Sequence, residues 1–341
     1  MITGHGDDAY VYNKNIIANF SSNVYYDGFP DGLRDRLIAT IAKINTYPEA
    51  NADSLSHCLA EWHNLAADKL LVTNGATEAF YLIAQSLRNK RVTIIIPSFA
   101  EYEDACRTAD LSLEFLDWSE LDASTRFTTD AVFLGNPNNP TGAILRKELL
   151  QSLLENNPQT TFMIDEAYVD FTPEPVSMVE ELIHFPHLIL VKSLTKTHAI
   201  PGLRLGYIIS NPTIIKHITS YKMPWSVNTM AIEAGKYIIH NRLNFPLPLE
   251  QLLTDTQQLI QQLRKQQQVE ITPTHTNFFL CETKNGSAAD LKSFLVNEYG
   301  ILIRDASNFR GLNNKHFRIA TQTAAKNELL INAVGQWIID N

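Results

Sequence analysis

Seven short runs of apolar and β-branched residues, separated by segments with helical spacing, are the feature that most restricts the fold of this chain. Several runs are continuously apolar rather than alternating, which is typical of strands that helices cover on both faces. The pattern predicts an α/β fold whose large domain has a doubly wound, mostly parallel sheet. The predicted strands are Leu70–Thr73, Val92–Ile96, Leu113–Leu116, Ala131–Leu134, Thr161–Ile164, Leu188–Val191 and Leu205–Ile209.

The remaining residues predict a second, smaller α+β domain. A glutamine-rich helix around Leu249–Gln268 leads into it. We expect an N-terminal arm at residues 1–44 that contributes to the small domain, a large domain at 45–225 and a small domain at 226–341. The length of 341 residues suits about two domains of ~150 residues each. The expected strands are Phe278–Cys281, Leu302–Arg304 and Phe317–Ala320, and the expected helices are Ala288–Glu298 and Lys326–Ile339.

The charge and cysteine content exclude several classes of protein. A net charge of −9, with acidic and basic residues interspersed, argues against a nucleic-acid partner, which needs a basic face. Cys58, Cys106 and Cys281 have neither disulfide-pair nor metal-site spacing, so we expect a reducing cytoplasm and no bound metal. The first residues lack the pattern of a signal peptide, and no apolar run approaches the roughly 18 residues of a membrane span.

Lys196 is the residue that most clearly predicts a chemistry. It follows the buried run Leu188–Val191, with Ser193 and Thr195 just before it and Arg204 eight residues after it. A lysine that is partly desolvated at a strand end can form a Schiff base with an aldehyde. Hydroxyls and an arginine beside it can hold a phosphate. These groups together suggest pyridoxal phosphate, although a surface lysine at a strand end is the simpler alternative.

Three loops that follow other predicted strands supply matching groups. In Asn74–Glu78, Ala76 and Thr77 would expose backbone N–H groups at a helix start, as a phosphate site requires, although an ordinary helix cap explains the same residues. In the rigid loop Asn136–Gly142, Asn139 can donate a hydrogen bond to a phenolate oxygen. Asp165 can pair with a protonated ring nitrogen, or it can simply cap a helix, and Tyr168 lies three residues further on.

Taken in order, Gly-Ala-Thr, Asn-Asn-Pro-Thr-Gly, Asp-x-x-Tyr and Ser-x-Thr-Lys with the later arginine resemble the class I and II, fold type I pyridoxal-phosphate enzymes over essentially the whole chain. The resemblance implies that Lys196 is the Schiff-base lysine, that Asp165 pairs with the pyridinium nitrogen, and that Asn139 and Tyr168 bond the ring oxygen. It also implies that Phe99 stacks on the ring, and that Tyr47 reaches the cofactor phosphate of a neighbouring subunit in a homodimer with shared active sites. The implied phosphate ligands are Ala76, Thr77, Ser193, Thr195 and Arg204.

Two branches of this family fit the length: histidinol-phosphate aminotransferases and threonine-phosphate decarboxylases. Three segments are more similar to the decarboxylases: Gly4-His-Gly with Asn19–Asn23, Pro97–Tyr102, and Ile303–Leu312, which resembles Arg-Asp-Cys/Ala-Ser-Asn-Phe-x-Gly-Leu. Departures include Asp7 where a second glycine is usual and Gln322 near a common basic position. The implied substrate is a small phosphorylated amino acid or amine, bound by His5, Arg304 and Arg318.

The expected reaction is therefore decarboxylation of L-threonine O-3-phosphate to (R)-1-amino-2-propanol O-2-phosphate, a building block of the cobalamin side arm. Transfer of the amino group of histidinol phosphate to 2-oxoglutarate, a step of histidine biosynthesis, is the alternative. A cofactor-binding sensory domain without turnover would normally need an attached DNA-binding module. A nucleotide-binding α/β protein would normally carry a Gly-x-Gly-x-x-Gly or Gly-x-x-x-x-Gly-Lys motif, and this chain has neither.

Overall fold

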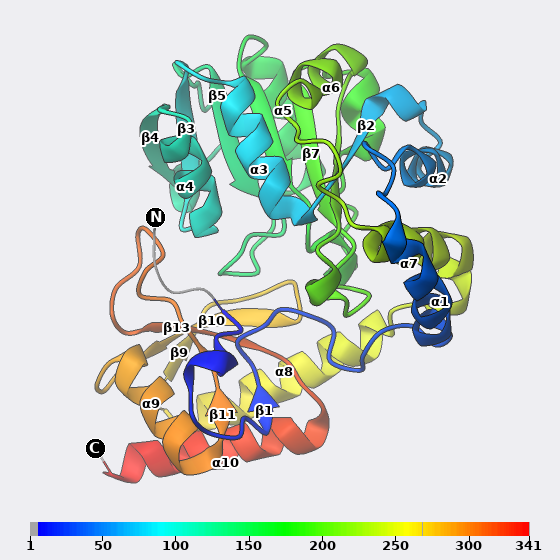
Figure 1. The fold of residues 1–341 in the computed structure, drawn as a ribbon. Helices are drawn as coiled ribbons and strands as arrows, with labels where there is room; N and C mark the ends of the chain where they lie inside the picture. Colours follow the sequence, from blue (N-terminus) through cyan, green and yellow to red (C-terminus); the bar gives the residue numbers. More distant parts are fainter. Residues whose placement is uncertain (1–5, 268, 341) are drawn as a thin grey trace.

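The structure, a computed structural model, describes residues 6–267 and 269–340. A large domain built on one twisted sheet lies above a smaller domain that includes α8, α9 and α10 (Figure 1). No helix in the described part of the chain is long and apolar enough to cross a membrane.

The large domain has the predicted α/β fold with a mostly parallel sheet. The strand order is β2-β8-β7-β6-β5-β3-β4, and β8 is the one strand of this sheet that runs antiparallel to its neighbours. Every predicted run forms a strand, with ends that differ by at most two residues. The strands are β2 (Leu70–Thr73), β3 (Arg91–Ile96), β4 (Ser112–Asp117), β5 (Ala131–Gly135), β6 (Thr161–Asp165), β7 (Leu188–Ser193) and β8 (Gly206–Ile209).

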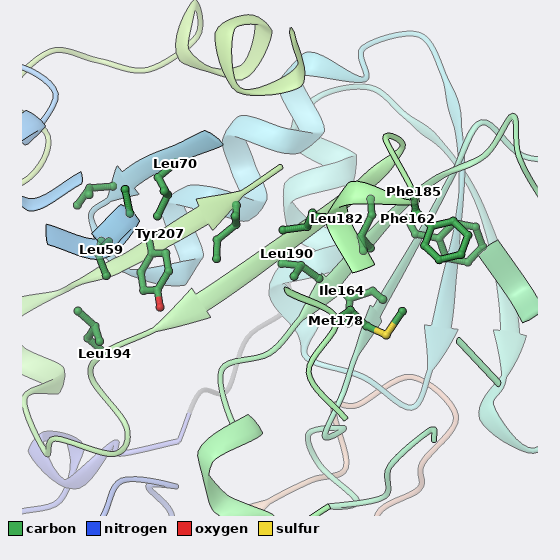
Figure 2. Packing of buried hydrophobic residues seen from close by; sticks show 14 of the residues in the cluster. Leu59, Leu70, Phe162, Ile164, Met178, Leu182, Phe185, Leu190, Leu194 and Tyr207 are labelled. Atoms are coloured by element: carbon green, nitrogen blue, oxygen red, sulfur yellow. The ribbon is translucent and has the colours of Figure 1, made fainter. Parts of the chain in front are cut away.

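Helices cover both faces of this sheet, which explains why its strands are continuously apolar. Successive strand residues point to opposite faces, so Phe162 and Ile164 enter one core while Met163 enters the other. Figure 2 shows the first of these cores, where Leu190 of β7 lies near Tyr207 of β8. One face is covered by α2 (Asp53–His63), α5 (Lys147–Asn156) and α7 (Thr229–Asn241), and the other by α3 (Gly75–Ser86), α4 (Ala100–Thr108) and α6 (Pro212–Thr219).

The small domain combines a four-stranded antiparallel sheet with three helices. Its strand order is β12-β13-β10-β9, and the N-terminal strand β1 pairs separately with β11. The elements are β1 (Ala18–Asn19), α8 (Leu249–Lys265), β9 (Val269–Ile271), β10 (Phe278–Thr283), α9 (Ala288–Tyr299), β11 (Ile301–Leu302), β12 (Arg304–Asp305), β13 (His316–Ala320) and α10 (Ala324–Asp340).

The single strand expected at Leu302–Arg304 is wrong. The chain changes partner at Ile303, because β11 pairs with β1 while β12 pairs with β13. This change places Arg304 directly opposite Arg318 in the antiparallel pair. A run of three residues gives no sequence signal for such a change of partner.

The packing of two helices bears on the expected domain limits. Ala231, Ile232 and Ile239 of α7 enter the core of the large sheet, although they follow the expected boundary at residue 225. Leu33 of α1 (Leu33–Thr40) packs against α7, whereas Ala18 and Phe20 enter the core of the small domain. We therefore propose that the large domain continues through α7, and that the N-terminal arm is divided between the two domains.

Candidate active site

A cavity of about 240 Å³ is lined by residues of both domains. The large domain contributes residues that follow the carboxyl ends of its strands, where ligands collect in sheets of this kind. The small domain contributes Arg304, Phe309 and Arg318, and the N-terminal segment contributes Gly6, Asp7 and Ser21 to Asn23. The predicted residues that line the cavity are Ala76, Thr77, Phe99, Asn139, Asp165, Tyr168, Ser193, Thr195, Lys196, Arg204, Arg304 and Arg318.

One part of the cavity is lined by hydrogen-bond donors that can bind an anion. Ala76 and Thr77 are the second and third residues of α3, where unpaired backbone N–H groups and the helix dipole favour a negative charge. The Ser193 and Thr195 hydroxyls lie 2.8 Å apart beside them. Arg204 has a left-handed φ of 57° and donates through Nη1 to the Pro201 carbonyl at 3.1 Å.

Glycines allow these elements to approach closely. A Cβ atom on Gly75 would lie 2.6 Å from Arg204 Nη2, and one on Gly206 would lie 2.6 Å from the Ala76 nitrogen. The helix start and Arg204 can therefore converge only because these two positions lack side chains. The converging hydroxyls, N–H groups and guanidinium fit the phosphate of pyridoxal phosphate.

Asp165, at the end of β6, is buried and firmly held. Its Oδ2 accepts a hydrogen bond from the Tyr102 hydroxyl at 2.7 Å, and its Oδ1 accepts one from the Ala167 nitrogen at 2.9 Å. Burial raises the pKa of Asp165 to about 6, although these two hydrogen bonds and the charge of Lys196 oppose the rise. A buried carboxylate of this kind is suited to pair with a protonated ring nitrogen.

The orientation of the Asn139 amide follows from its neighbour. Arg318 Nη1 donates to Asn139 Oδ1. Because a guanidinium can only donate, the oxygen faces Arg318 and the amide nitrogen remains as a donor for a ring oxygen. The preceding loop is rigid, since Asn138 Nδ2 donates to the Pro97 carbonyl at 3.0 Å and Asn136 bonds both backbone groups of Leu145.

Aromatic residues complete the walls beside the carboxylate. Phe99 makes edge contacts with Phe80 at 6.3 Å and with Tyr102 at 6.0 Å between ring centroids. Tyr168 packs edge-on against Phe278 of the small domain at 4.8 Å. These contacts fix the two rings that the sequence assigns to the cofactor, Phe99 and Tyr168.

Arg318 joins three parts of the chain. Besides Asn139 of the large domain, it donates through Nη2 to the Ser21 carbonyl of the N-terminal segment at 2.6 Å. Burial lowers the pKa of Arg318 to about 10, so the side chain remains charged at neutral pH. Its Nε has no hydrogen-bond partner among the described residues, and neither does the buried side-chain amide of Asn23, which lines the same cavity.

The guanidinium of Arg304 is positioned by residues of the loop that follows it. Its Nη2 donates to Asn308 Oδ1 at 2.8 Å, its Nη1 donates to the Asp305 carbonyl, and its guanidinium lies 5.1 Å from the Phe309 ring centroid. Burial lowers the pKa of Arg304 to about 10 as well. Two buried, charged guanidinium groups in one cavity favour a ligand with more than one anionic group.

Of the predicted residues that the structure describes, Tyr47 does not line this cavity. Tyr47 is 82% exposed, and its ring lies tilted against that of Trp225 with a centroid distance of 5.0 Å. His5 lies outside the described residues.

Tyr102, Asn23 and Phe309 have no role predicted from the sequence, although all three lie in segments that resemble the family. The role of a buried polar group such as the Tyr102 hydroxyl becomes clear only when its partner is known, and here that partner is Asp165, 63 residues away in the sequence.

Comparison with known proteins agrees with this geometry. The family model for aminotransferase class I and II matches residues 15–334. The threonine-phosphate decarboxylase of Salmonella typhimurium is 32% identical, covering 93% of this chain and 90% of that protein. A histidinol-phosphate aminotransferase of Caldanaerobacter subterraneus is 31% identical, with coverages of 85% and 84%.

A solved structure is similar throughout. The crystal structure of L-threonine-O-3-phosphate decarboxylase from Porphyromonas gingivalis is 41% identical, with a TM-score of 0.92 and coverage of 95% of this chain and 100% of that one. The family match over most of the chain, together with donors suited to the cofactor, shows that this protein belongs to the aminotransferase class I and II family of pyridoxal-phosphate enzymes.

Proposed function

We propose that this protein decarboxylates L-threonine O-3-phosphate to (R)-1-amino-2-propanol O-2-phosphate, a building block of the cobalamin side arm. The observation that carries the proposal is the pair Arg304 and Arg318, which face one cavity together with the cofactor donors. The decarboxylase relatives of 32% and 41% identity support the same reaction. The three free cysteines favour a cytoplasmic location as part of this proposal.

The cavity residues divide between cofactor and substrate. We assign the cofactor phosphate to the α3 start, Ser193, Thr195 and Arg204, and the ring nitrogen to Asp165. Asn139 and Tyr168 would bond the ring oxygen, and Phe99 would cover the ring. Pyridoxal phosphate, when bound, supplies the electron sink that accepts the pair of a broken bond at the substrate α-carbon.

The substrate carries a carboxylate and a phosphate, and the two arginines hold these anions. Both guanidinium groups remain protonated at neutral pH, since their pKa values are lowered only to about 10. Arg318 Nε and the Asn23 amide are buried donors without partners in the described chain, so both can bond the same ligand. Fixing the phosphate orients the carboxylate for loss as carbon dioxide, because only the bond perpendicular to the ring is weakened.

Lys196 has two tasks in this scheme. It would hold the cofactor covalently when no substrate is bound, and its free Nζ, or a bound water, would return a proton to the substrate α-carbon after carbon dioxide leaves. Its backbone is fixed near the site, since the Lys196 carbonyl accepts a hydrogen bond from the Tyr25 nitrogen at 3.0 Å. Tyr25 lies in the N-terminal arm, so this arm helps to position the reactive lysine.

A second candidate function is amino transfer from histidinol phosphate. The histidinol-phosphate aminotransferase relative of 31% identity favours it, because its similarity also extends over most of the chain. The two functions share the cofactor residues and differ in which bond at the α-carbon breaks.

We further propose that the enzyme is a homodimer with shared active sites. Large apolar side chains are exposed near Tyr47, and Ile44, Tyr47 and Trp225 line one surface groove. An exposed apolar surface of this kind is typical of a subunit interface. In the dimer, Tyr47 would reach the cofactor phosphate of the partner subunit. The exposed apolar residues that we assign to this interface are Ile38, Ile41, Ile44, Tyr47, Met223 and Trp225.

The reaction can be assayed directly. With pyridoxal phosphate, we expect release of carbon dioxide from L-threonine O-3-phosphate and far slower release from unphosphorylated threonine, which lacks one of the two anions. Transfer of the amino group of histidinol phosphate to 2-oxoglutarate, without carbon dioxide release from threonine phosphate, would contradict the proposal and establish the second candidate.

Lys196→Ala should lower turnover by more than about 10³-fold, which is ~4 kcal/mol at the transition state. It should also abolish covalent attachment of the cofactor, measured by mass spectrometry after borohydride reduction, while circular dichroism stays unchanged. Lys196→Arg should fail equally, because arginine does not lose its proton. Lys216→Ala, at an exposed position of α6, is the control and should behave as wild type. Attachment at another lysine would refute the assignment.

Asp165→Asn should lower the decarboxylation rate by about 100-fold, since it removes the carboxylate that keeps the ring nitrogen protonated. Asp117→Asn is the matched control, because Asp117 also ends a parallel strand but lies outside the cavity. Nearly full activity in Asp165→Asn would show that another group supports the ring.

The stability of the same variant without cofactor should depend on pH differently from that of wild type. The pKa of Asp165 is raised to about 6 in the folded protein. The wild-type protein is therefore more stable at low pH, where Asp165 is protonated, and loses this part of its unfolding free energy as the pH rises through about 6. Relative to wild type, cofactor-free Asp165→Asn should gain up to about 3 kcal/mol in unfolding free energy between about pH 4 and pH 7.5. Urea titrations across this range measure the difference, and a constant difference would disprove the shift.

The dimer is tested by sedimentation. Wild type should have twice the chain mass of 38.5 kDa, and Ile44→Glu should shift toward the monomer because a charge is costly at an apolar interface. Leu243→Glu, at another exposed apolar position, should leave the dimer intact. A monomeric wild type at micromolar concentration would contradict the proposal.

A further inference from the structure

Helix α4 presents three residues at the spacing of one helix face: Phe99 at its N-cap, Tyr102 and Glu103. Phe99 lines the active-site cavity, and Tyr102 bonds Asp165. Glu103 has no place in the cavity, yet its side chain is almost fully buried. A buried carboxylate needs partners, and one of the two arginines that bond Glu103 lies in the other domain.

Arg310 of the small domain forms a two-pronged ion pair with Glu103. Its Nε donates to Oε2 at 2.8 Å and its Nη2 donates to Oε1 at 2.7 Å. The Arg310 guanidinium also lies 4.1 Å from the ring centroid of Phe115 in β4. The hydrogen bonds from Arg310 are the largest cause of a lowered pKa for Glu103. Two parallel charged hydrogen bonds over an aromatic face fix the direction of the guanidinium.

The loop that carries Arg310 also holds the substrate arginine. Asn308 and Phe309 both contact the Arg304 guanidinium. The loop is compact, with backbone hydrogen bonds from Phe309 to Ala306 and from Leu312 to Phe309 at 3.1 and 3.0 Å. A movement of Arg310 is therefore passed to Asn308 and Phe309, one or two residues away.

We propose that Glu103 and Arg310 are a positioning pair that bridges the two domains and sets Arg304 at its working distance from the cofactor site. The inference rests on the proposed function for the identity of the substrate. The pair touches no substrate and acts through the loop from Ala306 to Leu312. Because α4 also carries Tyr102, the same helix connects the Asp165 carboxylate with the substrate-binding arginine.

The test compares Arg310→Gln, Glu103→Gln and their double variant with wild type. Each variant should raise KM for threonine phosphate about tenfold, with kcat changed less than about threefold, since substrate binding is affected more than chemistry. The double variant should equal each single one, because both remove the same contact. Arg310→Lys keeps the charge and should restore part of the loss. Hydrogen exchange of backbone amides 306–312 should be faster in all three glutamine variants.

Arg107→Gln is the matched control. Arg107 also donates to Glu103 Oε1, at 2.8 Å, but it lies on α4 itself and does not bridge the domains. It should leave both KM and loop exchange at wild-type values. Equal effects from Arg107→Gln, additive effects in the double variant, or unchanged loop exchange in Arg310→Gln would overturn the proposal. The exchange measurement uses no substrate, so it decides the bridge even if wild type fails to decarboxylate threonine phosphate.

Discussion

The common direction of the strands is the constraint on which the whole active site depends. β2, β3, β5, β6 and β7 all run the same way, so the segments that follow them meet at one edge of the sheet. The α3 start follows β2, Phe99 follows β3, Asn139 follows β5, and Lys196 follows β7, while Asp165 ends β6. Residues separated by more than 100 positions in the sequence thereby face one cavity. A parallel sheet requires crossover helices, and these helices bury both faces and leave this edge open.

Buried charges of both signs give the cavity its chemical character. Asp165 is held by hydrogen bonds yet is costly to ionise, and two arginines are buried opposite it in the small domain. Buried charges are stable when they have partners of opposite charge. A cofactor with a protonated ring and a substrate with two anionic groups would be such partners. The site is therefore complementary to a loaded state. This explains why the Asn23 amide and Arg318 Nε are buried without partners among the described residues.

Side chains of the small domain bond and orient residues of the large domain. Arg318 orients the Asn139 amide and holds the Ser21 carbonyl, so one side chain ties together the large domain, the small domain and the N-terminal arm. The Glu103–Arg310 pair makes a second connection at the outer edge of α4.

The sequence by itself determined the strands of the large sheet and most of the cavity. Continuous apolar runs, turn residues at strand ends and the order of the motifs are local signals, and they were sufficient to predict that Asp165, Lys196 and the start of α3 line one cavity. The tertiary structure decided what local signals do not carry. It placed α7 on the large sheet and divided the expected strand at Ile303. It also paired Tyr102 with Asp165, Arg318 with Asn139, and Glu103 with Arg310. These contacts join residues 63 to 207 positions apart in the sequence, so no local pattern predicts them.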